Sequence, residues 1–290
     1  MHGRPWSRIA DGRLGGMRAQ IEAAGTLVIG AAAMAAILLA GPALVAPLVP
    51  TRWSQAGQEA VFVVALYGAM VAVALLAGVI LQRKVTSLGI GPGRRLATGL
   101  SIGLSGIALA TGFAAIAGTL TGGAGGAGSL AFLLLGWVLV LFQAAAEELY
   151  FRGWIQPVLA GAWGVLPAIG VSALVFAALH LIGAAAAPLS FLNLLLGGLL
   201  FGALAAQGGG LAGAIGAHFA WNGTEQLVLG LDPNPGIGSF GSLFDFDLAG
   251  APIWGGSAEG LNASLAMAMA LIVLLVPLAM LARRPAASLR

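Results

Sequence analysis

Residues 131–152, AFLLLGWVLVLFQAAAEELYFR, run from an unbroken apolar stretch directly into two adjacent carboxylates and an arginine. The apolar part is typical of a membrane-spanning helix, and a carboxylate inside a bilayer costs about 2.5–3.5 kcal/mol on insertion scales. Acidic residues are therefore rare in such segments unless they face a cavity or take part in chemistry. Two later apolar segments each contain one histidine, His180 and His218, and the remaining histidine is His2. An acid and two imidazoles confined to apolar segments suggest an active site within a membrane.

The composition indicates an integral membrane protein. Of the 290 residues, 59% are hydrophobic and only 8% are charged, whereas soluble domains have roughly 25% charged residues. The 46 glycines suit the close approach of helices in lipid. The absence of cysteine excludes disulfides, thiolate chemistry and cysteine-based metal sites. A pI of 10.2 could suggest nucleic acid as a partner, but the basic residues flank apolar runs, so we expect an orientation signal and no nucleic acid.

Eight apolar runs are long enough to cross about 30 Å of hydrocarbon as helices. The predicted fold class is therefore all-α, a polytopic membrane helix bundle with about eight transmembrane helices. Between the fourth and fifth runs, residues 153–162 contain Trp154 and Pro157 and resemble an interfacial elbow. The predicted spans are residues 23–49, 60–81, 96–120, 129–150, 164–183, 188–206, 211–230 and 261–282.

The distribution of charge predicts that both termini are cytoplasmic. With eight spans, all of the 13 Lys and Arg residues except Arg52 and Arg152 fall in cytoplasmic segments, as the positive-inside rule requires. The many alanines and glycines suggest a GC-rich bacterial genome, and hence a bacterial plasma membrane. The expected organisation is a cytoplasmic basic arm (1–22), three N-terminal transmembrane helices (23–128), a catalytic four-helix membrane core (129–230), an extracytoplasmic loop (231–260), and a last transmembrane helix with a basic tail (261–290).

The two adjacent acids have different local partners. Neighbouring helical positions lie about 100° apart, so Glu147 and Glu148 point in different directions. Glu148 and Arg152 are four residues apart, in the favourable order for an ion pair. That pair either supports a site or simply neutralises itself at the membrane edge. Glu147 has no such partner on its own helix, which makes it the better candidate for chemistry.

The histidines carry weaker signals when taken one at a time. His180 follows Phe176 by four residues near the end of an apolar helix, where a lone histidine is usually a hydrogen-bonded core residue. His218 and Asn222 share one helix face, with Glu225 a further turn along. Such a polar stripe faces a wet cavity or makes hydrogen bonds between helices.

Together these residues supply what peptide hydrolysis requires, namely a base for water and donors for the developing oxyanion. A carboxylate and two imidazoles could equally hold a divalent metal with an open position. The metal alternative is zinc on Glu147, His180 and His218; otherwise no cofactor is expected.

The order of Glu147-Glu148-x-x-x-Arg152, Phe176-x-x-x-His180 and His218-x-x-x-Asn222 resembles the motif series of the CPBP family of intramembrane proteases. That family includes type II CAAX prenyl endopeptidases and bacterial relatives linked to bacteriocin immunity. The resemblance covers about residues 129–230. It implies a helical bundle with a conical cavity open to the cytosol and to lipid. It also implies that Glu147, helped by His180, activates water, that His218 and Asn222 stabilise the oxyanion, and that Glu148 and Arg152 orient their helix.

The resulting prediction is an endopeptidase acting on a membrane-embedded or lipidated protein. The alternatives are a non-catalytic scaffold or bacteriocin self-immunity protein and, third, a proton-coupled transporter using Glu147 and Glu225 as relays. The predicted spans place Glu147 and His180 at different depths in the membrane, because Glu147 lies near the cytoplasmic end of its span and His180 comes late in the next one. For Glu147 and His180 to meet, the elbow must dip into the membrane or the fourth span must continue past Gly153.

Overall fold

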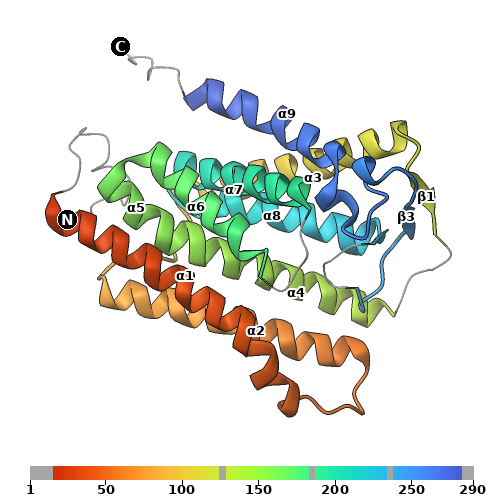
Figure 1. Cartoon of the computed structure of the whole chain (residues 1–290), viewed down its shortest axis with the longest axis horizontal. Helices are drawn as coiled ribbons and strands as arrows, with labels where there is room; N and C mark the ends of the chain where they lie inside the picture. Colours follow the sequence, from red (N-terminus) through yellow and green to blue (C-terminus); the bar gives the residue numbers. More distant parts are fainter. Residues whose placement is uncertain (1–15, 124–128, 183–186, 234–237, 283–290) are drawn as a thin grey trace.

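The structure, a computed structural model, describes residues 16–123, 129–182, 187–233 and 238–282. It confirms the all-α class: the helices form one elongated bundle (Figure 1). Six of the basic residues predicted to be cytoplasmic lie outside the described residues, namely Arg4, Arg8, Arg13, Arg283, Arg284 and Arg290.

Every predicted span overlaps a helix. Five helical stretches of the described chain are long and apolar enough to cross a membrane: Met17–Leu48, Gln55–Ile80, Pro92–Ile116, Leu130–Trp163 and Pro188–Gly208. Because Val165–Leu179 and Leu265–Met280 are shorter, the number of eight crossings stays a prediction. The helices are α1 (Met17–Val45), α2 (Gln55–Ile80), α3 (Pro92–Ile116), α4 (Leu130–Glu148), α5 (Gln156–Trp163), α6 (Val165–Leu179), α7 (Pro188–Gly208), α8 (Ala212–Gly223) and α9 (Leu265–Ala282).

The outer surface of the bundle is apolar, as lipid requires. Large aliphatic side chains are exposed along most of the helices, including Val28 and Leu39 on α1, Leu76 and Val79 on α2, and Leu134 on α4. Water-soluble monomers rarely expose contiguous apolar surface of this kind. Together with the composition, this makes the chain an integral membrane protein.

The expectation of an interfacial elbow at residues 153–162 was wrong. A π-helical turn, Leu149–Ile155, joins α4 to α5, so that Leu130–Trp163 is one continuous helical stretch of 34 residues. A π turn widens the helix without ending it. Trp154, which we expected at the membrane interface, is instead buried, and its ring lies near Gly30 of α1, where an added Cβ would collide with Ile155.

A sharp turn at Gly164 returns the chain alongside this stretch. The φ angle of Gly164 is +87°, a value that side chains other than glycine rarely tolerate. The next helix, α6, has only 15 residues and ends at His180. About as many residues separate Glu147 from Gly164, so the returning helix brings His180 back to the depth of Glu147. Glu147 and His180 can therefore meet because the fourth span continues past Gly153, and not because an elbow dips into the membrane.

Glycines on α3 allow α8 to pack at backbone distance. A Cβ atom on Gly99 or Gly103 would collide with the carbonyl oxygen of Gly213 or Ala217, and one on Gly106 would collide with the ring of Trp221. This spacing is the small-residue pattern that draws membrane helices together. Since α8 also contacts α4, the packing fixes the helix that carries His218 and Asn222 beside the helix that carries Glu147.

We expect Gly103→Ala to lower the free energy of unfolding by about 1–3 kcal/mol, the usual cost of overpacking. The matched control is Gly112→Ala on the same helix, where an added Cβ would have no neighbour within 4 Å. The control should be neutral or slightly stabilising, because alanine favours helix over glycine. Chemical unfolding in mixed detergent micelles measures both variants, and equal effects would contradict a role for close approach at Gly103.

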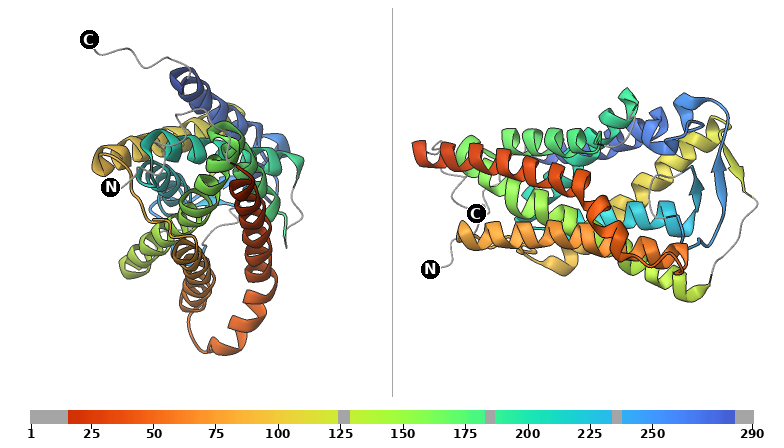
Figure 2. Two further views of the ribbon diagram at one scale, coloured as in Figure 1. Left: turned by 90° about the vertical axis from the view of Figure 1, so that its left-hand side faces the viewer. Right: turned by 60° about the horizontal axis from the view of Figure 1, so that its bottom comes forward.

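One end of the bundle has a small sheet that the sequence analysis did not anticipate (Figure 2, right). Its order is β1-β3-β2, with β1 (Leu120–Gly122) antiparallel to β3 (Phe246–Leu248) and β2 (Leu231–Asp232) parallel to β3. The loop that supplies β2 and β3 also holds the start of α7. The carboxylate of Glu259 accepts hydrogen bonds from the Ala187 amide and the Ser190 hydroxyl, and Asn193 donates to the carbonyls of Asn262 and Ser264.

The buried apolar residues form three cores. One is formed by α1, α2, α6 and residues 149–163, a second by α3, α7, α8 and α9, and a third by α2 and α4 with Leu227 and Phe240. In Figure 1, α1 and α2 lie on one side and α9 on the opposite side, with α4, α6, α7 and α8 between them. The polar residues singled out in the sequence lie on or directly after α4, α6 and α8, in this middle layer.

Candidate active site

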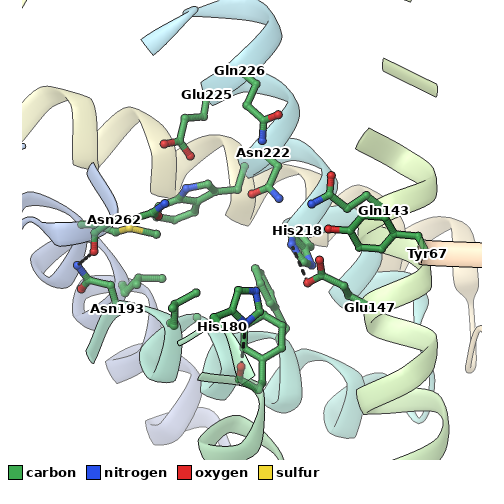
Figure 3. Close-up of a pocket in the computed structure, with 17 residues that line it drawn as sticks. Tyr67, Gln143, Glu147, His180, Asn193, His218, Asn222, Glu225, Gln226 and Asn262 are labelled. Atoms are coloured by element: carbon green, nitrogen blue, oxygen red, sulfur yellow. Dashed lines mark hydrogen bonds and ion pairs between the residues drawn. The ribbon is translucent and has the colours of Figure 1, made fainter. Parts of the chain in front are cut away.

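A cavity of about 270 Å³ lies at the centre of the bundle. All four residues predicted to be catalytic, Glu147, His180, His218 and Asn222, line it, although they come from three different helical segments (Figure 3). Phe176 also lines it. The other lining residues are Tyr67, Gln143, Asn193, Leu194, Gly197, Phe201, Trp221, Glu225, Gln226, Asn262, Met267 and Leu271.

Both helices that supply the polar groups change to π geometry beside the cavity. Glu147 and Glu148 end α4 immediately before the π turn Leu149–Ile155, and Asn222 precedes a second π turn, Thr224–Val228. π turns are uncommon and often occur at functional sites, because the wider turn shifts the register of the side chains that follow.

Glu148 and Arg152 form a fully buried ion pair behind the cavity wall. Arg152 Nη1 lies 3.3 Å from Glu148 Oε1, and neither side chain is exposed. The pair does not stand alone, because His218 Nδ1 lies 2.8 Å from the same carboxylate oxygen. An ionised carboxylate only accepts hydrogen bonds, so Nδ1 of His218 is the donor. The two charges therefore do more than neutralise each other, because Glu148 also sets the orientation of His218.

Aromatic rings enclose these charged groups. The guanidinium of Arg152 lies over the ring of Phe176 at 4.8 Å and donates through Nη2 to the Gly198 carbonyl at 3.0 Å. Phe201 stacks on the imidazole of His218 with 4.6 Å between ring centroids and 12° between planes. Since α7 supplies both Gly198 and Phe201, it keeps water away from the pair and fixes the plane of the His218 ring.

Glu147 has polar neighbours on its own helix and on two others, although it has no cation on its own helix. Its Oε2 atom lies 3.9 Å from His218 Nε2, too far for a direct hydrogen bond but close enough for one water to bridge. The hydroxyl of Tyr67 and the carboxamide of Gln143 lie beside its carboxylate (Figure 3). The two ring nitrogens of His218 thus face two carboxylates, Glu148 at Nδ1 and Glu147 at Nε2.

His180 caps the end of α6 on the far side of the cavity from Asn222 (Figure 3). Its Nδ1 lies 2.8 Å from the Phe176 carbonyl oxygen, which can only accept, so Nδ1 is the protonated nitrogen. In the neutral ring Nε2 is then a free proton acceptor. The two histidines therefore suit opposite roles, His180 as a base and His218 as a donor.

A metal does not fit this arrangement well. Within the described ranges, no three His, Cys, Asp or Glu side chains are grouped closely enough to hold an ion. Glu147, His180 and His218, the predicted zinc ligands, share the cavity without converging on one point. These three side chains therefore do not form a zinc site in this arrangement.

Five lining residues with hydroxyl or amide side chains had not been singled out from the sequence, namely Tyr67, Gln143, Asn193, Gln226 and Asn262. Tyr67 lies inside an apolar run with no neighbouring polar residue at helical spacing, and the two asparagines belong to no motif. A tyrosine or asparagine in the middle of a span is the only signal that could have drawn attention to them.

Comparison with known proteins supports the resemblance stated from the motifs. The family model described as Type II CAAX prenyl endopeptidase Rce1-like matches residues 129–224. The matched segment begins just before α4, ends at Thr224 after α8, and contains all seven of the predicted catalytic and supporting residues. Comparisons with curated proteins and with solved structures gave no match.

Proposed function

We propose that this protein is an intramembrane endopeptidase that hydrolyses a peptide bond of a membrane-associated protein. Similarity to the prenyl endopeptidase family over residues 129–224 supports proteolysis in general. The observation that carries the proposal is the cavity itself, in which an acid, a free imidazole nitrogen and two potential oxyanion donors surround one space.

Glu147 is the proposed base, assisted by His180. A water molecule in the cavity gives its proton to the Glu147 carboxylate, and its oxygen attacks the carbonyl carbon of the substrate. The neutral His180 ring, with Nδ1 bonded to Phe176, offers Nε2 as a second acceptor on the other side of the cavity. When the C–N bond breaks, the proton held by Glu147 passes to the leaving amine.

His218 and Asn222 are the proposed oxyanion donors. The tetrahedral intermediate carries a negative oxygen, which preorganised donors stabilise strongly where water is excluded. Asn222 offers its amide N–H groups, and His218 offers Nε2–H when its ring carries both protons. Glu148, which accepts from Nδ1, orients that ring and is in turn neutralised by Arg152. Glu148 and Arg152 are therefore positioning residues.

We also propose that the catalytic chemistry is metal-free, that the substrate is membrane-embedded or lipidated, and that both termini face the cytoplasm of a bacterium. The charge pattern supports this orientation. Arg83, Lys84, Arg94 and Arg95 lie in the connection between α2 and α3 and in the first turn of α3, at the opposite end of these helices from β1. The loop at the sheet end carries acids and no Lys or Arg.

The direct test compares the membrane proteomes of cells that contain the wild-type protein or the Glu147→Gln variant. Uncut precursors should accumulate in the variant, and their shortened forms should appear only with the wild type. Identical sets of peptide termini in the two membranes would contradict proteolysis and favour the scaffold or immunity alternative.

A further inference from the structure

Glu225 is a buried acid of the cavity that the proposed mechanism does not use. It lies in the π turn that follows α8, is 6% exposed and lines the cavity. The seventeen lining residues include a second carboxylate, Glu147, but neither lysine nor arginine. The arginine behind the cavity wall, Arg152, is already paired with Glu148.

Among the residues that the structure describes, Glu225 makes no ion pair. Its polar neighbour in the cavity wall is the indole of Trp221, which is uncharged and cannot neutralise a carboxylate. A carboxylate removed from water without a cation is costly, and a cation that arrives with a ligand offsets that cost. The surroundings of Glu225 therefore favour a ligand with a positive charge.

One further group in the cavity wall, the side chain of Asn193, also offers an unused acceptor. Asn193 donates through Nδ2 to two carbonyls, those of Asn262 and Ser264, which identifies its other terminal atom as the carbonyl Oδ1. That Oδ1 atom is buried and has no partner. In Figure 3, Glu225, Asn193 and Asn262 lie away from Glu147, across the cavity. Unused acceptors in this region call for a ligand rich in N–H donors.

We propose that Glu225 forms a specificity subsite for a lysine or arginine side chain of the substrate. The inference rests on the proposed endopeptidase function and deepens it by naming a substrate feature. An ammonium or guanidinium group would form charge-assisted hydrogen bonds with the Glu225 carboxylate. The same acid disfavours the free carboxylate of a substrate that ends at this point.

The position of the basic residue follows from the length of the helix. Glu225 lies seven positions after His218, or about 10 Å along the helix axis at 1.5 Å per residue. An extended peptide advances about 3.3–3.6 Å per residue, so the basic side chain belongs within about three residues of the scissile bond.

The experiment uses fluorogenic peptides that carry a farnesylated cysteine. Each of the three positions on either side of the scissile bond is occupied in turn by lysine, norleucine or acetyl-lysine. With the wild-type protein, we expect lysine to raise kcat/KM over norleucine at least about tenfold at one position, the scale of one charge-assisted hydrogen bond. Acetyl-lysine, which is similar in length but uncharged, should lose that advantage without any change in the protein.

In the Glu225→Gln variant, the lysine-to-norleucine ratio at that position should fall to about one. Glu22→Gln is the matched control, because Glu22 pairs with Arg83 outside the cavity, and it should keep the wild-type ratio. Cleavage without a preference for lysine at any position, or a preference that survives in Glu225→Gln, overturns the subsite alone. Failure of the wild-type protein to cleave any peptide overturns the proposed function and the subsite with it.

Discussion

Glu147→Gln is expected to lower kcat by about a thousandfold or more, with the protein still folded. Glutamine fills the same volume beside Tyr67 and Gln143 but cannot accept a proton from water. General bases contribute about 10²–10⁴-fold to catalysis, and the loss should be in kcat, because the base acts on the attacking water. Initial rates with a cleavable peptide, measured on purified protein in detergent, give the comparison.

Two controls make this result interpretable. Glu22→Gln removes a carboxylate from a surface ion pair by the same substitution and should keep wild-type turnover. The unfolding midpoint of Glu147→Gln should stay close to that of the wild type, because glutamine fills the same volume and His218 keeps its closer ion-pair partner, Glu148. Wild-type turnover by a folded Glu147→Gln protein would mean that the acid is not the base.

Arg152→Met is expected to lower the free energy of unfolding by about 3–5 kcal/mol, the cost of breaking a buried ion pair from one side. Methionine replaces the aliphatic part of the side chain but leaves Glu148 as a buried charge with only His218 to compensate it. The contacts with the Gly198 carbonyl and the Phe176 ring are lost as well. Unfolding in mixed micelles measures the stability, and peptide cleavage measures the activity, which should also fall.

The double variant Glu148→Gln/Arg152→Met separates stability from catalysis. Removing both charges leaves no unpaired buried ion, so stability should recover part of the loss. Activity should not recover, because an uncharged glutamine side chain would orient the ring of His218 less firmly than the Glu148 carboxylate does. Stability that does not recover in the double variant would show that the lost contacts of Arg152, and not the orphaned charge of Glu148, cause the destabilisation. Activity that returns with stability would exclude a positioning role for Glu148.

The residues of the site could be predicted because ionisable side chains are rare in an apolar chain and are therefore easy to recognise. An acid or imidazole inside a span needs a reason to be there, and motif spacing placed four of them, with Arg152, Phe176 and Asn222, on three segments that do meet. The Glu148–Arg152 pair was equally readable, as an i,i+4 pair on one helix face. The link from Glu148 to His218 was not readable, because it crosses between helices that are far apart in the sequence.

The parts of the fold that could not be predicted depend on tertiary structure. Trp154 and Pro157 suggested an interfacial elbow, but Pro157 directly follows the π turn, at the second residue of α5, and the helix continues through it. The π turn that keeps the helix continuous has no sequence signature. Strands of two and three residues are too short for alternation to be seen, and they exist only because the ends of distant helices bring them together.

The hydrogen bonds that hold the start of α7 couple the loop at the sheet end to the active site. Glu259 and the carbonyls at residues 262 and 264 grip the first turns of this helix, while further along it Phe201 covers the imidazole of His218. The helix α7 thus connects the loop at the sheet end to the imidazole of His218. A force on that loop, from a ligand or from thinning of the lipid leaflet, would be transmitted along α7. It would tilt the stacked rings of Phe201 and His218.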